Sequence, residues 1–150
     1  MQRQEKGGSF MQYEMTWRVQ YYETDSMGIV HHSNYVRYFE TARTEFIRDA
    51  GMPYDRIEEL GIYIPVIGVK VDYKTGAVYD EVISLICRPT VLSHASFELE
   101  YEVRNAETGQ LHAKGWSRQA FTDKTFRPVV VKKAAPEVYE VFRRIYEDDN

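Results

Sequence analysis

The stretch SNYVRYFETARTEFIRDA, residues 33–50, decides the fold that the sequence predicts. Its apolar residues return every three or four positions, as in a helix that packs one side on a core. Ser33 and Asn34 offer side chains that can cap the first turn, and Gly51 and Pro53 end the helix. The residues on the apolar side are Tyr35, Phe39, Ala42, Phe46 and Ala50. Because several of them are large aromatics, the pattern favours a helix that fills a core.

Strands flank this helix on both sides along the chain. Apolar and polar residues alternate over residues 13–22, as in a half-buried strand, and most of residues 62–123 also reads as strands. The alternation slips near Pro65 and Val66, which predicts a bulge or a break there. Further predicted elements are a helical turn at residues 54–60, a hairpin turn at 107–110 and a terminal helix from Pro136.

This order of elements indicates the fold class. One strand, one long helix and about four further strands do not alternate as a doubly wound sheet requires. We therefore expect an α+β fold, in which an antiparallel sheet of five or six strands wraps around the helix, in one domain over residues 13–150. Residues 1–12 are mostly polar and include Gly7, Gly8 and Ser9, so we expect a flexible leader there.

The composition argues against several classes of function. With 150 residues, 43% of them hydrophobic, the chain suits one compact domain. A net charge of −4, with both signs mixed along the chain, argues against nucleic acid as a partner. No apolar run approaches the roughly 20 residues that span a bilayer, and no signal peptide opens the chain, so we expect a cytoplasmic protein. Cys87, the only cysteine, lies in an apolar strand and favours a buried structural thiol.

Familiar catalytic motifs do not account for a function. The GWS at residues 115–117 lacks the second glycine of a nucleophile elbow, and no glycine-rich phosphate loop is present. His31 and His32 are adjacent and would not share one metal ion, so we expect no metal site. What remains is the segment before the long helix, where Asp25 and Gly28 suit the first and fourth positions of a type I turn.

Asp25 has a structural and a catalytic interpretation. The turn alone explains it, because aspartate is favoured at the first position of such turns. A carboxylate a few residues before a core helix, however, lies near backbone N–H groups without helical partners and near the positive end of the helix dipole. Such donors can hold a carbonyl oxygen while the carboxylate acts on the carbon. The residues alone leave both interpretations open.

The run YETDSMGIVHHSNY at residues 22–35, followed by FETARTEF at residues 39–46, resembles the signature of one enzyme family. That family is the hotdog-fold acyl-CoA thioesterases of the 4-hydroxybenzoyl-CoA thioesterase and YbgC type. The resemblance implies a hydrolase without metal or cofactor, in which Asp25 matches the catalytic aspartate and His32 assists. The backbone N–H groups at His32 and Ser33 are candidates for polarising the thioester carbonyl. The expected substrate-binding residues are Tyr22, Gly28, Ser33 and Asn34.

Some roles stay open within this resemblance. Asp25 would attack the carbonyl to form a mixed anhydride, or would deprotonate a water that attacks instead. His32 would orient Asp25 or the substrate, or would bond only to neighbouring backbone. Another branch of hotdog thioesterases uses an acid on the helix, where Glu40 stands, but we favour an ion pair of Glu40 with Arg37 or Arg43.

The resemblance also implies partners and an assembly. The expected substrate is acyl-CoA, or an acyl group on acyl carrier protein, and the expected assembly is a dimer or tetramer with active sites at subunit interfaces. Two rival functions remain: a hotdog module that binds acyl thioesters without hydrolysing them, and a hydratase-type hotdog enzyme for enoyl thioesters. Candidate partners for the CoA phosphates are Arg88, Arg118, Arg127, Lys132 and Lys133, each of which is otherwise an ordinary surface charge.

Overall fold

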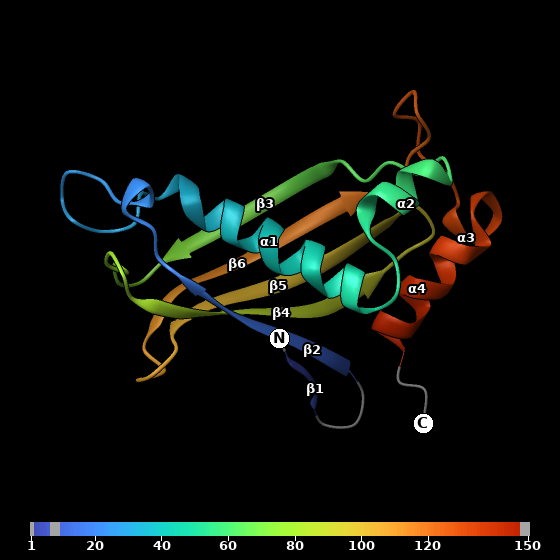
Figure 1. Ribbon diagram of the computed structural model, residues 1–150. Helices are drawn as coiled ribbons and strands as arrows, with labels where there is room; N and C mark the ends of the chain where they lie inside the picture. Colours follow the sequence, from blue (N-terminus) through green and yellow to red (C-terminus); the bar gives the residue numbers. More distant parts are fainter. Residues whose placement is uncertain (1, 7–9, 148–150) are drawn as a thin grey trace.

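The computed structural model describes residues 2–6 and 10–147 of the chain. Within them, six strands form one antiparallel sheet in the order β1-β2-β4-β5-β6-β3. Helix α1 (Ser33–Asp49) lies along one face of this sheet (Figure 1). The strands are β1 (Gln2–Lys6), β2 (Phe10–Arg18), β3 (Val66–Tyr73), β4 (Val82–Leu92), β5 (Ser96–Asn105) and β6 (Leu111–Ala120). The predicted α+β architecture, an antiparallel sheet around one long helix, is confirmed.

Aromatic side chains hold α1 on the sheet. Phe39 stacks on Tyr101 of β5, with the ring centroids 4.4 Å apart. Phe46 stacks in the same way on Tyr13 of β2, at 5.3 Å. Gly115 of β6 makes room for the helix, because a Cβ at that position would lie 2.2 Å from the Phe39 ring. The apolar side that the sequence predicts for this helix is therefore the side that is buried.

Two segments differ from the sequence prediction. β2 ends at Arg18 and a 3-10 turn, η1 (Tyr21–Glu23), follows it, so the strand is shorter than the alternation over residues 13–22 suggests. Within the expected leader, the described residues 2–6 and 10–12 belong to strands that pair antiparallel with each other. Gly7, Gly8 and Ser9 lie outside the described residues. A backbone that pairs at a sheet edge needs no side-chain period, which is why the sequence pattern missed β1.

The remaining elements agree with the prediction. The register of β3 against β6 shifts between Val66 and Gly68, where the bulge is expected. Helices α2 (Tyr54–Glu59) and α4 (Pro136–Tyr146) are present, and one further short helix, α3 (Val131–Ala134), precedes α4. α4 covers the end of the sheet opposite the start of α1 (Figure 1). None of the helices among the described residues has the length and apolar character needed to cross a membrane.

Candidate active site

Asp25 lies in a tight turn that brings the chain back to the start of α1. Its backbone N–H donates to the carbonyl of Ile29 at 2.9 Å, and its own carbonyl accepts the N–H of Gly28 at 3.0 Å. The carboxylate oxygen Oδ1 accepts the N–H of Met27 at 2.8 Å. Gly28 has a φ of 82°, which favours glycine. The turn predicted from Asp25 and Gly28 is confirmed, and within the described structure Oδ2 of Asp25 remains without a hydrogen-bond partner.

A buried carboxylate, Glu23, fixes the chain just before this turn. Its Oε1 accepts hydrogen bonds from the Gln20 N–H at 2.7 Å, the Trp17 indole at 3.1 Å and the Tyr38 hydroxyl at 3.1 Å. Burial, together with the Glu23 carboxylate, raises the pKa of Tyr38, so this phenol stays protonated and donates. Glu23 therefore ties β2, η1 and α1 together directly ahead of Asp25.

The start of α1 differs from the prediction that Ser33 or Asn34 caps it. His32 is the N-cap residue, and it makes no side-chain cap hydrogen bond. Nδ1 of His31 instead accepts the backbone N–H of Ser33 at 3.2 Å, and the Asn34 amide donates to the carbonyl of Glu23 at 2.8 Å. Of the two N–H groups expected to polarise a carbonyl, that of Ser33 is therefore occupied. In the described part of the chain, the N–H of His32 has no acceptor.

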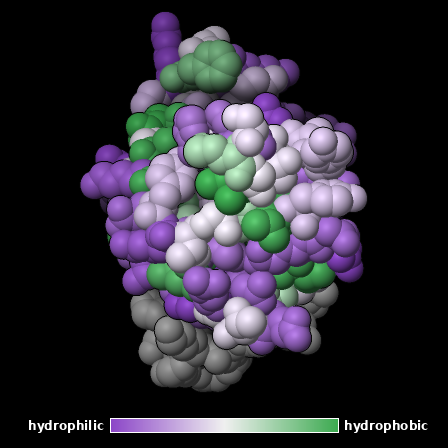
Figure 2. Space-filling model, turned by 90° about the vertical axis from the view of Figure 1, so that its left-hand side faces the viewer, coloured by the Kyte–Doolittle hydropathy of each residue, from purple (hydrophilic) through white to green (hydrophobic). Residues whose placement is uncertain are grey.

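Asp25 and His32 line one hollow of about 250 Å³ at the end of the molecule where α1 begins. Figure 2 faces this end and shows small hydrophobic patches separated by hydrophilic side chains. No hydrogen bond joins Asp25 and His32 in the described structure. The other lining residues are Met27, Ile29, Val30, Tyr35, Tyr73, Lys74, Thr75 and Gly76. The structure thus brings together the two residues that the sequence predicts as catalytic.

One wall of this hollow comes from the end of β3 and the residues after it, which the sequence did not indicate. The hydroxyl of Tyr73 donates to the carbonyl of His32 at 3.1 Å, and its ring meets that of Tyr35 edge-on at 5.5 Å. A Cβ on Gly76 would lie 2.6 Å from the Ile29 side chain, so this glycine allows the wall to approach the Asp25 turn. Only the alternation along β3 signalled Tyr73, and it gave no hint of a site.

The four residues predicted to bind substrate do not line this hollow. Tyr22 is 79% exposed, and Asn34 is buried and committed to Glu23. Gly28 belongs to the Asp25 turn, and Ser33 pairs with His31. Their contribution to the hollow is therefore indirect, through the shape of the turn and the position of the helix start.

The competing carboxylate, Glu40, is exposed on α1 and lies outside the hollow. The ion pair expected with Arg37 or Arg43 is not present among the described residues. The guanidinium of Arg43 is instead buried, and it donates to the hydroxyls of Tyr54 at 3.2 Å and Tyr101 at 3.1 Å. The expected ion pair is therefore wrong: Arg43 points into the protein, and Arg37 forms no ion pair with Glu40 in the described structure.

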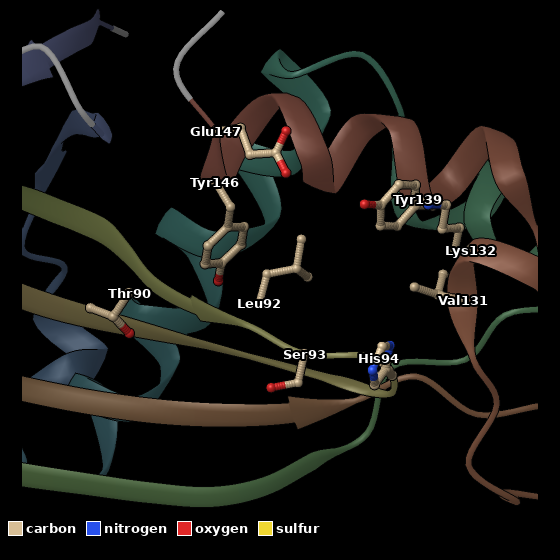
Figure 3. A pocket seen from close by; sticks show the side chains of 9 residues that line it. All are labelled: Thr90, Leu92, Ser93, His94, Val131, Lys132, Tyr139, Tyr146 and Glu147. Atoms are coloured by element: carbon tan, nitrogen blue, oxygen red, sulfur yellow. The ribbon is translucent and has the colours of Figure 1, made fainter.

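The basic residues proposed for CoA phosphates are dispersed. Arg88 of β4 forms an ion pair of 2.8 Å with Glu102 and is half-buried, whereas Arg118 and Arg127 are exposed. A larger hollow of about 610 Å³ lies between the end of β4 and helices α3 and α4 (Figure 3). It includes Lys132 but neither Asp25 nor His32. Among the described residues, no three His, Cys, Asp or Glu side chains gather as metal ligands would.

Known proteins resemble this chain in sequence. The model of the thioesterase-like superfamily matches residues 19–144. YneP of Bacillus subtilis (strain 168) is 32% identical over 129 residues, which are 84% of this chain and 91% of that protein. The acyl-CoA thioester hydrolase YbgC of Escherichia coli O6:H1 is 28% identical over 95 residues, 63% of this chain and 71% of that protein.

Solved structures resemble it in fold. The DHNA-CoA thioesterase from Staphylococcus aureus superposes with a TM-score of 0.83 and is 29% identical, over 89% of this chain and 90% of that one. A protein from Thermus thermophilus, TT1821, gives a TM-score of 0.81 at 30% identity, over 90% of this chain and 98% of that one.

Proposed function

Because the chain belongs to the thioesterase-like superfamily, we propose that it hydrolyses acyl-CoA thioesters with Asp25 as the catalytic carboxylate. That membership confirms the family predicted from residues 22–46, and with it a thioester hydrolase of hotdog fold. The observation that supports Asp25 as the catalytic carboxylate is the hollow that Asp25 and His32 share at the start of α1. The YbgC relative, whose name gives acyl-CoA thioesters as its substrates, supports the substrate class.

Asp25 has two chemical routes to the same products. As a nucleophile, its carboxylate oxygen attacks the thioester carbonyl, the C–S bond breaks, CoA leaves as a thiolate, and water then hydrolyses the mixed anhydride. As a general base, it takes a proton from a water whose oxygen attacks the same carbon. Both routes release a free acid and CoA thiol. The unpartnered Oδ2 of Asp25 supports either route, because no group of the described structure has to be displaced from it.

We assign His32 two contributions. Its backbone N–H lacks an acceptor in the described structure and lies at the positive end of α1, which suits the developing oxyanion. Its ring lies against those of His31, at 4.2 Å, and Tyr73, at 6.3 Å, and forms part of the lining. Since no hydrogen bond joins His32 to Asp25, we propose that the ring contacts the substrate and does not orient Asp25.

The edge strand β3 supports an assembly of two or more chains. β3 pairs only with β6, so its outer edge is free within the described sheet. Val66, Ile67 and Val69 are 48%, 54% and 43% exposed. An exposed apolar edge strand is a typical site for pairing with another chain. We propose a homodimer, alone or as half of a tetramer, that places the Tyr73 wall of each hollow near a second subunit.

The substrate-binding surface extends beyond the hollow. Tyr73 and Met27 line the hollow, are exposed, and offer apolar surface for an acyl group or the start of the pantetheine arm. Arg118 and Arg127, which are exposed, remain the candidates for the CoA phosphates, from this subunit or from its partner. Acyl carrier protein is the alternative carrier. We place the enzyme in the cytoplasm, where the buried Cys87 thiol stays reduced.

A panel of aromatic and aliphatic acyl-CoAs, assayed for thiol release with a thiol-reactive dye, tests this function. We expect turnover that is proportional to the amount of protein and that yields one free acid for each thiol. Binding of acyl-CoA without thiol release would favour the non-catalytic module. Hydration of an enoyl-CoA without thiol release would favour the hydratase.

A further inference from the structure

A chain of three polar side chains lies behind the wall of the hollow. Nε2 of His112 lies 2.5 Å from Oε2 of Glu81, and Nδ1 of His112 lies 2.8 Å from the hydroxyl of Thr75. The His112 side chain is 3% exposed and that of Glu81 is 11% exposed. Thr75 is exposed and lines the hollow together with Asp25 and His32. A buried acid and imidazole are therefore hydrogen-bonded in series to the hydroxyl of a residue that lines the candidate active site.

The neighbours of Glu81 define which nitrogen of His112 carries a proton. Oε1 of Glu81 accepts the N–H of Val78 at 3.1 Å, and Oε2 accepts the side-chain amide of Asn105 at 2.9 Å. The orientation of that amide is fixed, because its oxygen accepts the backbone N–H groups of Glu107 and Thr108. Glu81 is thus an acceptor at both oxygens, so Nε2 of His112 is the donor to it.

The neighbours of the Thr75 hydroxyl determine whether it can donate or accept a further hydrogen bond. Besides Nδ1 of His112, its oxygen lies 2.8 Å from the carbonyl of Leu111, which can only accept. If His112 is neutral, the Thr75 hydroxyl donates its hydrogen bond to Nδ1 of His112 or to the Leu111 carbonyl. If His112 is protonated, its Nδ1 donates to the Thr75 oxygen, and the Thr75 hydroxyl donates to the Leu111 carbonyl. In both states the hydroxyl proton is directed at His112 or Leu111, so the Thr75 oxygen has only a lone pair to offer a further partner.

We propose that Thr75 is a substrate-binding residue that accepts a hydrogen bond from an N–H or O–H group in the active site, with His112 and Glu81 as its positioning residues. The donor is either the attacking water or an amide N–H of the pantetheine arm. A carbonyl or phosphate oxygen does not suit the site, since it brings no proton. This inference rests on the proposed thioesterase function, and it adds to Asp25 a second group, from the opposite wall, that contacts the reacting complex.

Two variants of Thr75 test the proposal by steady-state kinetics. Thr75→Val keeps the shape and removes the hydroxyl, and we expect kcat/KM to fall about fivefold to tenfold, as for the loss of one hydrogen bond. Thr75→Ser restores the hydroxyl, and we expect it to stay within about twofold of wild type. A loss in kcat identifies the attacking water as the donor, and a rise in KM identifies the pantetheine amide. Unchanged kinetics in Thr75→Val, or an equal loss in Thr75→Ser, would overturn the proposal.

A measurement on His112 keeps this test separate from the thioesterase function. In ¹⁵N NMR spectra of the wild type, we expect a proton on Nε2 of His112 and a shift of its Nδ1 signal in Thr75→Val. A neutral His112 protonated on Nδ1, or an Nδ1 signal that is unchanged in Thr75→Val, would contradict the proposed role of Thr75 and His112 even if the protein is an active thioesterase. The opposite result, expected spectra without thiol release from any acyl-CoA, rejects the function and with it the role of Thr75 in catalysis.

Discussion

The hydroxyl of Tyr73 at the end of β3 donates a hydrogen bond of 3.1 Å to the backbone carbonyl of His32 at the start of α1. It links the edge of the sheet to the helix end that carries the proposed oxyanion donor. Tyr73→Phe removes only this bond, and we expect kcat to fall about threefold to tenfold as the position of the His32 N–H relaxes. Tyr79→Phe, at another exposed tyrosine without a hydroxyl bond in the described structure, is the control. Equal activity of the two variants would contradict this role.

The buried carboxylate of Glu23 gives a prediction about stability. Glu23→Ala leaves three donors unpaired, from Trp17, Gln20 and Tyr38, and we expect the free energy of unfolding to fall by roughly 3 kcal/mol. Glu23→Gln retains an oxygen at the same place and should lose less than half of that amount. Urea unfolding curves of the three proteins provide the measurement. If both variants lose the same stability, the three hydrogen bonds to Oε1 are not the reason for burying this acid.

Gly115 provides a second test of the packing. Gly115→Ala puts a Cβ 2.2 Å from the ring of Phe39, so the helix or the strand has to move. We expect a loss of about 1–3 kcal/mol in unfolding free energy, as for other overpacked cores. Lys114→Ala changes the exposed neighbour on the same strand and should stay within about 0.5 kcal/mol of wild type. Equal stability of the two variants would mean that α1 does not approach β6 so closely.

The buried thiol predicts how stability depends on alkaline pH. Burial raises the pKa of Cys87 from 9.0 to about 12, and burial likewise raises that of Tyr13 to about 12. From pH 9 upward the unfolded chain loses the thiol proton while the folded chain keeps it, so stability falls as pH rises towards 12. The thiol contributes at most about 1.4 kcal/mol per pH unit. Cys87→Ala should therefore show a shallower slope between pH 9 and 11 in urea unfolding, and an identical slope would show that the thiol is not shielded.

The sequence predicted the parts of the structure that depend on neighbouring residues. The buried side of α1, the turn at Asp25 and the break near Val66 all follow from local spacing, and the structure has each of them. The predicted helix cap was wrong because Nδ1 of His31, two residues before Ser33, accepts the Ser33 N–H. Capping depends on the path of the preceding chain, which here is fixed by Glu23, and spacing alone does not give that path.

The wall of the hollow formed by Tyr73 and Thr75 could not be predicted from the sequence. Both residues stand about forty positions after His32 in the chain, and the pairing of β3 with β6 places them beside the start of α1. Register of this kind depends on the whole sheet and leaves no local signal. The burial of Glu23 was not predicted for a related reason. An acidic residue in a turn segment is expected to be exposed, and only the folded structure brings Trp17 and Tyr38 into hydrogen-bonding distance of it.

The most direct test of the account compares two aspartates at the same end of the molecule. Asp25→Asn keeps the Oδ1 atom that accepts the Met27 N–H, so the turn should persist and the melting temperature should stay close to wild type. Asp80→Asn is the matched control, because Asp80 is exposed, has a φ of 69° that asparagine tolerates, and lies outside the hollow. The measurement is kcat for thiol release from the best acyl-CoA substrate. We expect a loss of about 10² to 10⁴-fold in Asp25→Asn and of less than about twofold in Asp80→Asn. Turnover of folded Asp25→Asn at the wild-type rate would contradict a catalytic role of Asp25.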